Sequence, residues 1–204
     1  MCCRFYIYSS EEMNEIIESM PRSLIDKWNH TDEVKKSGEI RPTDVAPVIA
    51  PNSRGERAVY PMKWGFAEKS LLINARTESA SKKPTFADAW KSHRCIIPSS
   101  HYFEWEHLRD LSTGKEKTGA KYLIQAKDKE MTYLCGLYRI VDGLPYFVIL
   151  TREPAEEIKF IHDRMPLILP EERINEWIKP DSRPEDIIGS AVTDLYYEKC
   201  AKEQ

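Results

Sequence analysis

The stretch MTYLCGLYRI (131–140), followed closely by LPYFVILT (144–151), decides the fold class. Both runs are rich in β-branched and aromatic residues, which favour strands over helices. Apolar runs of the same kind recur along the chain. They are CCRFYIY (2–8), VAPVIA (45–50), AVYPMKWGF (58–66), LLINAR (71–76), RCIIP (94–98), YFEW (102–105) and KYLIQA (121–126). The sequence therefore predicts a strand-dominated protein.

Helix signals are few and short. Ser9 with Glu12 three residues later predicts a capping box that starts a helix in SSEEMNEIIESM (9–20), and Pro21 should end it. A TFAD box predicts a second helix, FADAWKSH (86–93), and EERINEWIK (171–179) predicts a late one. Many strands with short helices between them predict an α+β fold with an antiparallel, barrel-like core and short peripheral helices, not a doubly wound parallel sheet. RDLSTGKEKTG (109–119) is expected to be an exposed hairpin loop.

Length and composition bound the class of protein. A chain of 204 residues predicts one domain, residues 1–204. A monomer is expected. No apolar run approaches the roughly 20 residues that span a bilayer, and glutamates interrupt the first segment where a secretory signal would be apolar. We expect a cytoplasmic protein with no membrane contact. Its five cysteines show no CxxC spacing, so reduced thiols and no metal or other cofactor are expected.

The formal net charge of -3 hides an uneven distribution. Residues 61–95 hold seven basic and three acidic residues, whereas residues 153–204 hold seven basic and thirteen acidic ones. Two interpretations stay open: solvated faces of opposite sign, or an anion-binding surface in the middle of the chain.

Two polar residues at the ends of apolar runs are candidates for chemistry. Cys2 becomes the N-terminal residue when Met1 is removed, although most such cysteines have no function. Asn74 ends the run LLIN, where an amide is also common as a turn or cap residue. Each of these residues is a credible functional candidate only when the other candidates are present as well.

Two titratable residues complete the candidate set. Glu104 lies between Phe103 and Trp105, and an aromatic pocket raises a carboxyl pKa, although this side chain could equally point to solvent. His162 is the side chain type best suited to moving protons near neutral pH, although a lone histidine is usually structural.

A series of short motifs occurs in a specific order. They are MCCRF (1–5), APVI (46–49), WGF (64–66), INARTE (73–78), RCIIP (94–98) with FEW (103–105), CGLY (135–138) and IHDRMPLIL (161–169). In this order and spacing the chain resembles the SRAP family, abasic-site-sensing proteins named for their association with the SOS response. The resemblance covers nearly the whole chain.

The resemblance implies a catalytic set and a DNA-binding set. The catalytic set is Cys2, Asn74, Glu104 and His162, and Arg4 and Arg76 are the candidate phosphate contacts. The family's usual pattern has glycine in place of Cys3, and glycine and tyrosine in place of His101 and Phe103. These departures affect the expected rate and pocket shape more than the chemistry.

The implied chemistry explains why a cysteine occupies position 2. Without Met1, Cys2 carries an amine and a thiol on adjacent carbons, which together convert an aldehyde into a thiazolidine ring. The open-chain form of an abasic site supplies that aldehyde. Single-stranded DNA is the expected partner, and exposed rings of Trp64 and Phe66 would stack its bases, although Trp64 could equally be a core residue. Removal of Met1 is either self-catalysed, which would make the chain a thiol autopeptidase, or carried out by an aminopeptidase. Lyase activity at abasic sites is also expected.

Two rival functions and one rival site stay open at this level. A cysteine peptidase acting on other proteins would use Cys2 and His162 but not the α-amine. A non-covalent nucleic-acid-binding module would use only the basic segment. A metal site at His101, Glu104 and His107 is disfavoured, because in a strand Glu104 faces away from the two histidines.

Overall fold

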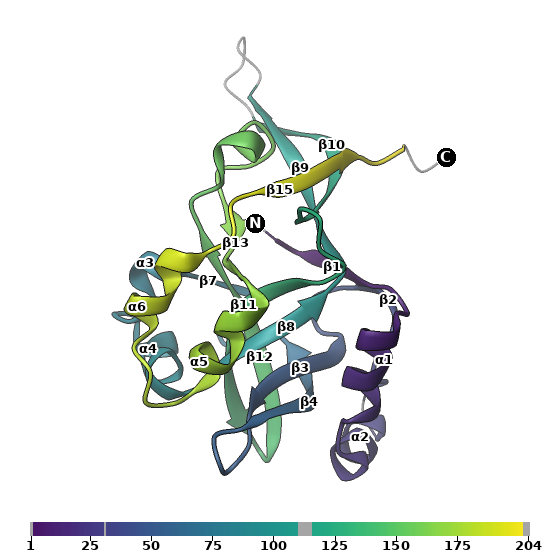
Figure 1. Ribbon diagram of the computed structural model, residues 1–204, viewed down its shortest axis with the longest axis vertical. Helices are drawn as coiled ribbons and strands as arrows, with labels where there is room; N and C mark the ends of the chain where they lie inside the picture. The colour runs from purple at the N-terminus through teal and green to yellow at the C-terminus, as the bar shows by residue number, and fades with distance from the viewer. Residues whose placement is uncertain (1, 31, 110–115, 202–204) are drawn as a thin grey trace.

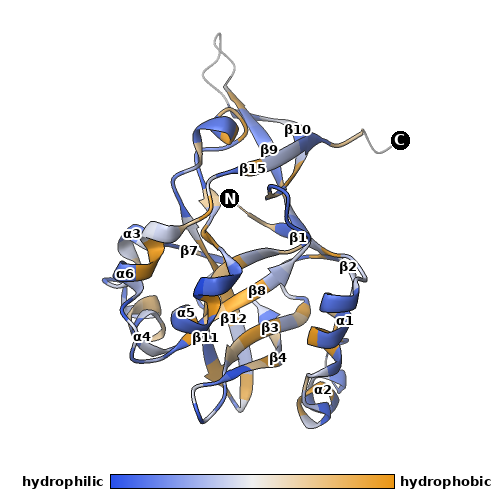
Figure 2. Cartoon of the chain, in the orientation of Figure 1, coloured by the Kyte–Doolittle hydropathy of each residue, from blue (hydrophilic) through white to orange (hydrophobic). Residues whose placement is uncertain are grey.

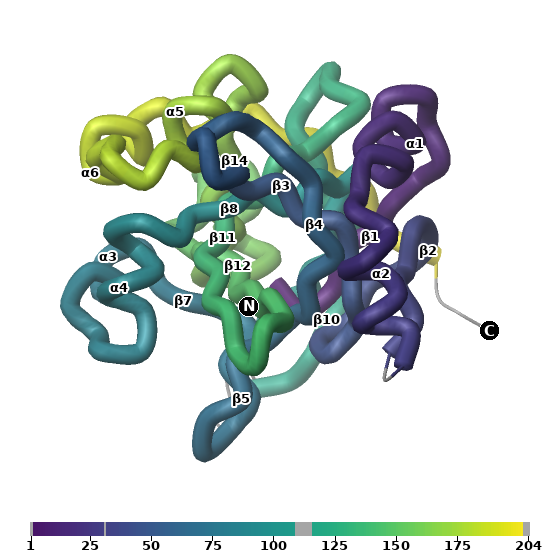
Figure 3. Tube along the Cα trace, turned by 90° about the horizontal axis from the view of Figure 1, so that it is seen from below, coloured from purple at the N-terminus to yellow at the C-terminus, as the bar shows by residue number. Residues whose placement is uncertain are grey.

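A closed barrel forms the larger part of the protein. The computed structural model describes residues 2–30, 32–109 and 116–201. Five strands follow one another around the barrel, and it closes because the first also pairs with the last. They are β12 (Leu144–Arg152), β4 (Arg57–Trp64), β3 (Val45–Pro51), β8 (Arg94–Ser99) and β11 (Thr132–Val141). Figure 3 shows these strands as a ring. The predicted strand-dominated, barrel-like core is thus confirmed.

Strand pairing in the barrel is antiparallel except at one seam. Strands β12 and β4 pair in parallel through Tyr146 with Lys63 and Phe147 with Trp64. Strand β7 (Asn74–Arg76) pairs with the same edge of β12, also in parallel, with Asn74 opposite Ile149. This seam holds Asn74 beside the barrel.

A tight turn sets the register of the β11–β12 hairpin. Val141 pairs with Leu144, and the two residues between them, Asp142 and Gly143, have φ angles of 52° and 75°. Positive φ at both central positions is the geometry of a type I′ turn, whose twist matches that of the flanking strands. The Asp-Gly pair therefore positions the apolar runs 131–140 and 144–151 against each other.

A second sheet continues from the barrel. Its five strands are, in order, β15 (Leu195–Lys199), β10 (Glu116–Ala126), β9 (His101–Arg109), β1 (Arg4–Ile7) and β2 (Gly38–Ile40). In Figure 1 this sheet lies above the barrel, and the chain passes from β8 into β9 with only Ser100 between them. Ser100 N–H donates to Tyr6 O at 2.9 Å, and its Oγ accepts from Tyr8 N–H at 2.8 Å. These bonds attach β1 at the corner between the two sheets.

The helices are short and peripheral, as predicted, but their starts differ from the sequence prediction. Helix α1 (Glu11–Glu18) is capped by Ser10, not Ser9: the Ser10 Oγ accepts from Met13 N–H at 3.2 Å. Helix α4 (Pro84–Ser92) begins one residue before the predicted TFAD box, because proline is favoured in the first turn. The late helix is split into the 3-10 turn η2 (Glu171–Arg173) and α5 (Ile174–Ile178).

The remaining elements are small. They are α2 (Arg22–Asn29), which the sequence did not predict, α3 (Thr77–Ala80), α6 (Pro184–Ile187), the 3-10 turns η1 (Glu156–Ile158) and η3 (Ile188–Ser190), and the strands β5 (Phe66–Ala67), β6 (Leu71–Leu72), β13 (Met165–Pro166) and β14 (Ile168–Leu169). Of the predicted hairpin loop, residues 116–119 belong to β10, and residues 110–115 lie outside the described part.

Hydrophobic residues concentrate in the barrel strands, whereas the upper sheet is more hydrophilic (Figure 2). Val48, Ile96, Leu134 and Val148, one from each of four barrel strands, are fully buried. Burial of this apolar surface provides the main favourable free energy of folding. Within the described residues, no helix has the length and apolar character needed to cross a membrane.

Candidate active site at the N-terminus

Cys2 lies at the junction of the two sheets and is completely buried. It precedes β1, and its carbonyl oxygen accepts a hydrogen bond from Asn74 Nδ2 at 2.8 Å. The Cys2 Sγ lies 3.8 Å from Arg4 O. Asn74 reaches Cys2 because β7 is held against β12, so an amide of the barrel fixes the first residues of the upper sheet. The Oδ1 of Asn74 is buried and has no hydrogen-bond partner among the described residues.

Glu104 is a buried carboxyl on β9, in register with Tyr122 of β10. Burial raises its pKa, while the positive α-amino group and the Trp105 N–H, which donates to Oε1 at 3.2 Å, act in the opposite direction. Burial and then the Glu104 charge raise the pKa of the Cys2 thiol well above its ordinary value. The thiol is therefore neutral at physiological pH, and its reaction requires a base that removes the proton.

His162 is buried, with 5% of its surface exposed, and follows η1. Burial first, and then the charge of the α-amino group, lower its pKa to about 4. The ring is therefore neutral at pH 7. Its Nδ1 accepts from Arg164 N–H at 2.9 Å, and its centroid lies 3.9 Å from that of His107.

All four predicted catalytic residues interact with the N-terminal segment, by a hydrogen bond or electrostatically. Asn74 bonds Cys2 directly, and the charge of Glu104 raises the Cys2 pKa. The α-amino charge lowers the pKa of both Glu104 and His162. The Cys2 thiol and the Glu104 carboxyl are thus buried groups that influence each other electrostatically, and the N-terminal charge acts on both Glu104 and His162.

An ion pair that the sequence interpretation missed joins two of the motifs. Arg164, 9% exposed, binds Glu78 through two parallel contacts, Nη1 to Oε1 at 2.8 Å and Nη2 to Oε2 at 2.9 Å. Its Nη2 also donates to Thr151 O at 2.7 Å. The pair connects INARTE to IHDRMP and so connects the segments that carry Asn74 and His162. The signal in the sequence was an acidic residue in one motif and a basic one in the other.

Comparison with known proteins identifies the family of this chain. The family model for SOS response associated peptidase (SRAP) matches residues 1–200. The chain belongs to the SRAP family. It is 32% identical over 203 residues to the abasic site processing protein YoqW of Bacillus subtilis, which covers 93% of this chain and 85% of that one. It is 31% identical over 150 residues to the abasic site processing protein YMR114C of Saccharomyces cerevisiae, covering 68% of this chain and 38% of the relative.

The fold is also found among solved structures. A protein of Bacteroides thetaiotaomicron superposes with a TM-score of 0.72 and 20% identity, covering 98% of this chain and 92% of the other. At that identity the match concerns the fold alone.

The aromatic rings expected to stack DNA bases are not exposed in this SRAP chain. Trp64 and Phe66 are both fully buried. Trp64 packs between Phe5 and Phe147, and its Nε1 donates to Ile73 O at 2.9 Å. The expectation of exposed rings is therefore wrong: Trp64 is a core residue that joins β1 to the barrel.

The basic segment contributes fewer accessible charges than its composition suggests. Arg94 is fully buried, and Lys63 pairs with Asp32 at 2.9 Å. Five basic side chains of the segment are exposed: Lys69, Arg76, Lys82, Lys83 and Lys91. Arg76 lies two residues beyond Asn74, at the end of β7.

Arg4, the other predicted phosphate contact, already has a partner. Its guanidinium pairs with Glu39, which also binds Arg41 and Lys121. Burial alone would raise the pKa of Glu39, but hydrogen bonds from these three cations hold it at about 2. Arg4 thus belongs to a mixed-charge cluster with a net positive charge.

The residues that depart from the usual SRAP pattern lie mainly away from Glu104. His101 and Phe103 alternate with Glu104 along β9 and pack with Tyr6, whose ring stacks on His101 at 5.1 Å. Burial lowers the pKa of His101 to about 4, with a smaller effect from the charge of Lys121. Cys3 is half-buried, and burial followed by the Glu104 charge raises its pKa. Only Cys3 therefore interacts electrostatically with the site.

A buried tyrosine was also missed by the sequence interpretation. Tyr102 is fully buried on the same face of β9 as Glu104, and its hydroxyl has no hydrogen-bond partner among the described residues. Burial raises its pKa well above the usual value, with smaller effects from Cys2 and Glu104.

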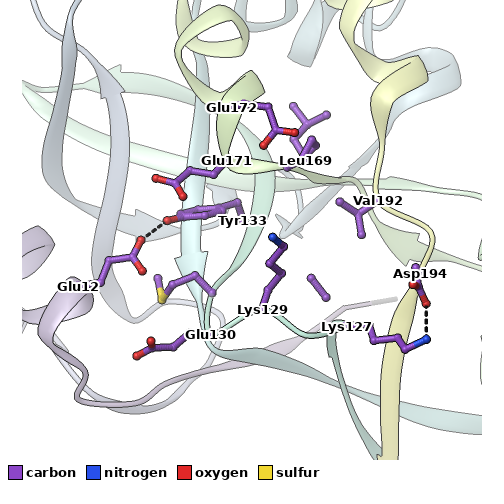
Figure 4. A pocket seen from close by; sticks show the side chains of 13 residues that line it. Glu12, Lys127, Lys129, Glu130, Tyr133, Leu169, Glu171, Glu172, Val192 and Asp194 are labelled. Carbon is purple, nitrogen blue, oxygen red and sulfur yellow. Dashed lines mark hydrogen bonds and ion pairs between the residues drawn. The ribbon is translucent and has the colours of Figure 1, made fainter.

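A surface pocket of about 400 Å³ lies elsewhere, between α1, β11 and η2. Figure 4 shows the Tyr133 hydroxyl directed at Glu12, with Glu171 and Lys129 nearby. None of the predicted catalytic residues lines it. The candidate site is thus defined by its buried polar groups rather than by this pocket.

Proposed function

We propose that this SRAP-family chain captures abasic sites in single-stranded DNA as a covalent thiazolidine formed by Cys2 after removal of Met1. The observation that carries the proposal is the hydrogen bond from Asn74 to the Cys2 carbonyl, which fixes the position of Cys2. The electrostatic effect of Glu104 on the Cys2 thiol supports it. The names of the curated relatives, abasic site processing proteins, support the substrate class.

The chemistry proceeds in two bond-forming steps. The Cys2 α-amine adds to the aldehyde carbon of the open-chain abasic sugar, and loss of water leaves an imine. The Cys2 sulfur then adds to the imine carbon, and the thiol proton ends on the nitrogen, which closes the five-membered ring. Glu104, with its raised pKa, supplies a proton to the departing hydroxyl. Neutral His162 accepts the thiol proton and passes it on.

DNA recognition in this proposal is electrostatic. Arg76 is exposed at the end of the strand that carries Asn74, and Arg4 begins β1 opposite Phe103, so phosphates on either side of the abasic nucleotide would meet a cation. A single strand is favoured, because no partner base has to be displaced. All four catalytic residues come from one chain, so a monomer suffices.

Removal of Met1 is a precondition of the mechanism. An N-terminal methionine blocks the amine of Cys2, whose nitrogen would then be an amide. The same nucleophile, base and acid could cleave that bond, which would make the chain an autopeptidase. Glu104→Ala retaining Met1 in cells would support self-processing over an aminopeptidase, and lyase activity would appear as strand cleavage beside the adduct.

The experiment compares intact masses of the purified protein with and without abasic single-stranded DNA. The expected result is a chain lacking Met1 that gains the mass of the DNA minus one water. Cys3→Gly is the matched control: it should form the adduct as the parent does, since the Cys3 nitrogen lies in a peptide bond. Cys2→Ser should yield only an imine that borohydride traps.

Each rival function gives a different result. Peptide turnover by a protein with a blocked α-amine would indicate a peptidase acting on other proteins. Reversible, salt-sensitive binding without a mass change would indicate a non-covalent module. A heat-stable adduct from Cys2→Ser, or none from Cys3→Gly, contradicts the assignment of the chemistry to Cys2.

A further inference from the structure

Three metal-binding side chains meet at the edge of the candidate active site. One ligand atom from each of His107, His162 and Asp163 lies within 4.8 Å of the other two. This set differs from the one that the sequence analysis disfavoured, because the second histidine and the carboxylate come from the IHDRMP segment, not from β9. No role in the proposed reaction has been given to His107 or Asp163.

The backbone holds the three residues together. His107 N–H donates to Ile161 O at 2.9 Å, which ties the end of β9 to the residue before His162. The His107 and His162 rings lie 3.9 Å apart, tilted by 54°. Asp163 Oδ1 lies 2.7 Å from His162 Nδ1. The cluster is therefore built on a strand and a bonded loop, which limits the movement needed to bind an ion.

Geometry and access suit a small divalent ion. Two ligands of a tetrahedral zinc ion, with bonds of about 2.0–2.1 Å, are roughly 3.3 Å apart. The separations of up to 4.8 Å close through rotation of two exposed side chains, since His107 and Asp163 (77% exposed side chain) lie open to solvent. His162 forms the buried side of the site.

The donor set selects the class of ion. Two imidazoles and one carboxylate are typical of zinc and neighbouring transition metals, whereas magnesium and calcium prefer oxygen ligands. A metal ion binds the unprotonated form of a histidine nitrogen. Binding through Nδ1 replaces the hydrogen bond from Arg164 N–H.

We propose that His107, His162 and Asp163 bind a divalent transition-metal ion of the zinc class, and that the bound ion inhibits DNA capture by occupying the proton-accepting nitrogen of His162. The binding site stands on geometry alone. The inhibitory role rests on the function proposed above, because it assumes that His162 accepts a proton during ring closure.

Binding is tested first, without DNA. Zinc is titrated against the parent, His107→Gln, Asp163→Asn and the control His30→Gln, which changes an exposed histidine at the end of α2, in competition with a chromophoric chelator. Loss of a metal ligand should weaken affinity at least roughly tenfold. We expect His107→Gln and Asp163→Asn to lose that much and His30→Gln to match the parent. Cobalt(II) spectra should show nitrogen and oxygen ligation without a thiolate band.

Inhibition is tested second, as the ratio of adduct-formation rates with and without zinc for each protein. Zinc should slow the parent and His30→Gln but leave His107→Gln unchanged. Parent-like zinc affinity in His107→Gln, or a cobalt–thiolate band that places the ion on a cysteine, overturns the site. Zinc binding without slowing overturns the inhibitory role. Absence of any adduct in metal-free parent refutes the proposed function instead, and the binding titration still decides the metal site.

Discussion

Asn74 provides the sharpest test of how the N-terminus is held. Its Nδ2 donates to the Cys2 carbonyl at 2.8 Å, a normal length for a strong neutral bond. Cys2 is completely buried, so in Asn74→Ala its carbonyl has no water to replace the lost donor. Leaving a buried polar group unsatisfied costs about 1–3 kcal/mol. If this cost falls on the reacting geometry, the rate of adduct formation drops roughly 5- to 150-fold.

A second variant separates the donor from the shape. Asn74→Asp keeps the size of the side chain but places a carboxylate oxygen against the Cys2 carbonyl oxygen. We expect it to react no faster than Asn74→Ala, because repulsion replaces attraction. Asn14→Ala, on the exposed side of α1, is the matched control and should behave as the parent.

The assay follows adduct formation on denaturing gels with saturating and limiting abasic single-stranded DNA. The loss should appear in the rate at saturation, while the half-saturating DNA concentration stays near the parent value, because Asn74 positions Cys2 and does not contact phosphate. A parent-like rate in Asn74→Ala, or a loss confined to affinity, would show that the hydrogen bond does not position the nucleophile.

Three further predictions concern stability and DNA binding. Arg94→Met should lower the free energy of unfolding by about 3 kcal/mol or more, because the buried guanidinium donates to carbonyls that include Trp90 O and Trp177 O, both at 2.8 Å. Urea denaturation measures this against the exposed control Arg54→Met, and equal midpoints would contradict it. Lowering the pH from 6.5 to about 4 should reduce the unfolding free energy, because burial lowers the pKa of His101 and His162 from 6.5 to about 4 and the unfolded chain binds more protons in this window. If the unfolding free energy of the double variant His101→Gln/His162→Gln depended on pH as steeply as that of the parent, this explanation would be contradicted. Arg76→Ala should reduce the slope of log affinity against log salt concentration for single-stranded DNA by about 0.7, because one phosphate contact is lost. Fluorescence anisotropy measures this slope, and the control Arg54→Ala should keep the parent value. An unaltered slope in Arg76→Ala would show that Arg76 is a solvated side chain.

Local sequence patterns were enough for the strands but not for every element boundary. β-branched and aromatic residues in 131–140 and 144–151 predicted strands, because their side chains suit a pleated surface whatever the partner. The boundary errors at Ser10 and Pro84 arose where two adjacent residues can both start a helix. Helix α2 was missed because only Trp28 of its residues is fully packed, so its apolar pattern is weak.

The candidate site was identified residue by residue from motifs, but its contacts were not. Asn74 and Cys2 are 72 positions apart in sequence, and they meet only because β7 pairs in parallel with β12. The partnership of Arg164 with Glu78 likewise depends on that seam. A parallel pairing between distant strands leaves no local signal, since neither strand's composition specifies its neighbour.

The sequence by itself determined the kinds of chemistry available: a cysteine that can become the N-terminal residue, a carboxyl among aromatic residues, and an imidazole in a family motif. Tertiary structure decided which of these groups are neutral, which are paired and which are reachable. It buried Trp64 and Arg94, which composition had counted as a stacking ring and a free charge, and it brought His107 against His162. The physical reason is that solvation and charge pairing depend on distances across the closed barrel and its attached sheet, whereas residue type and strand propensity are local properties of the chain.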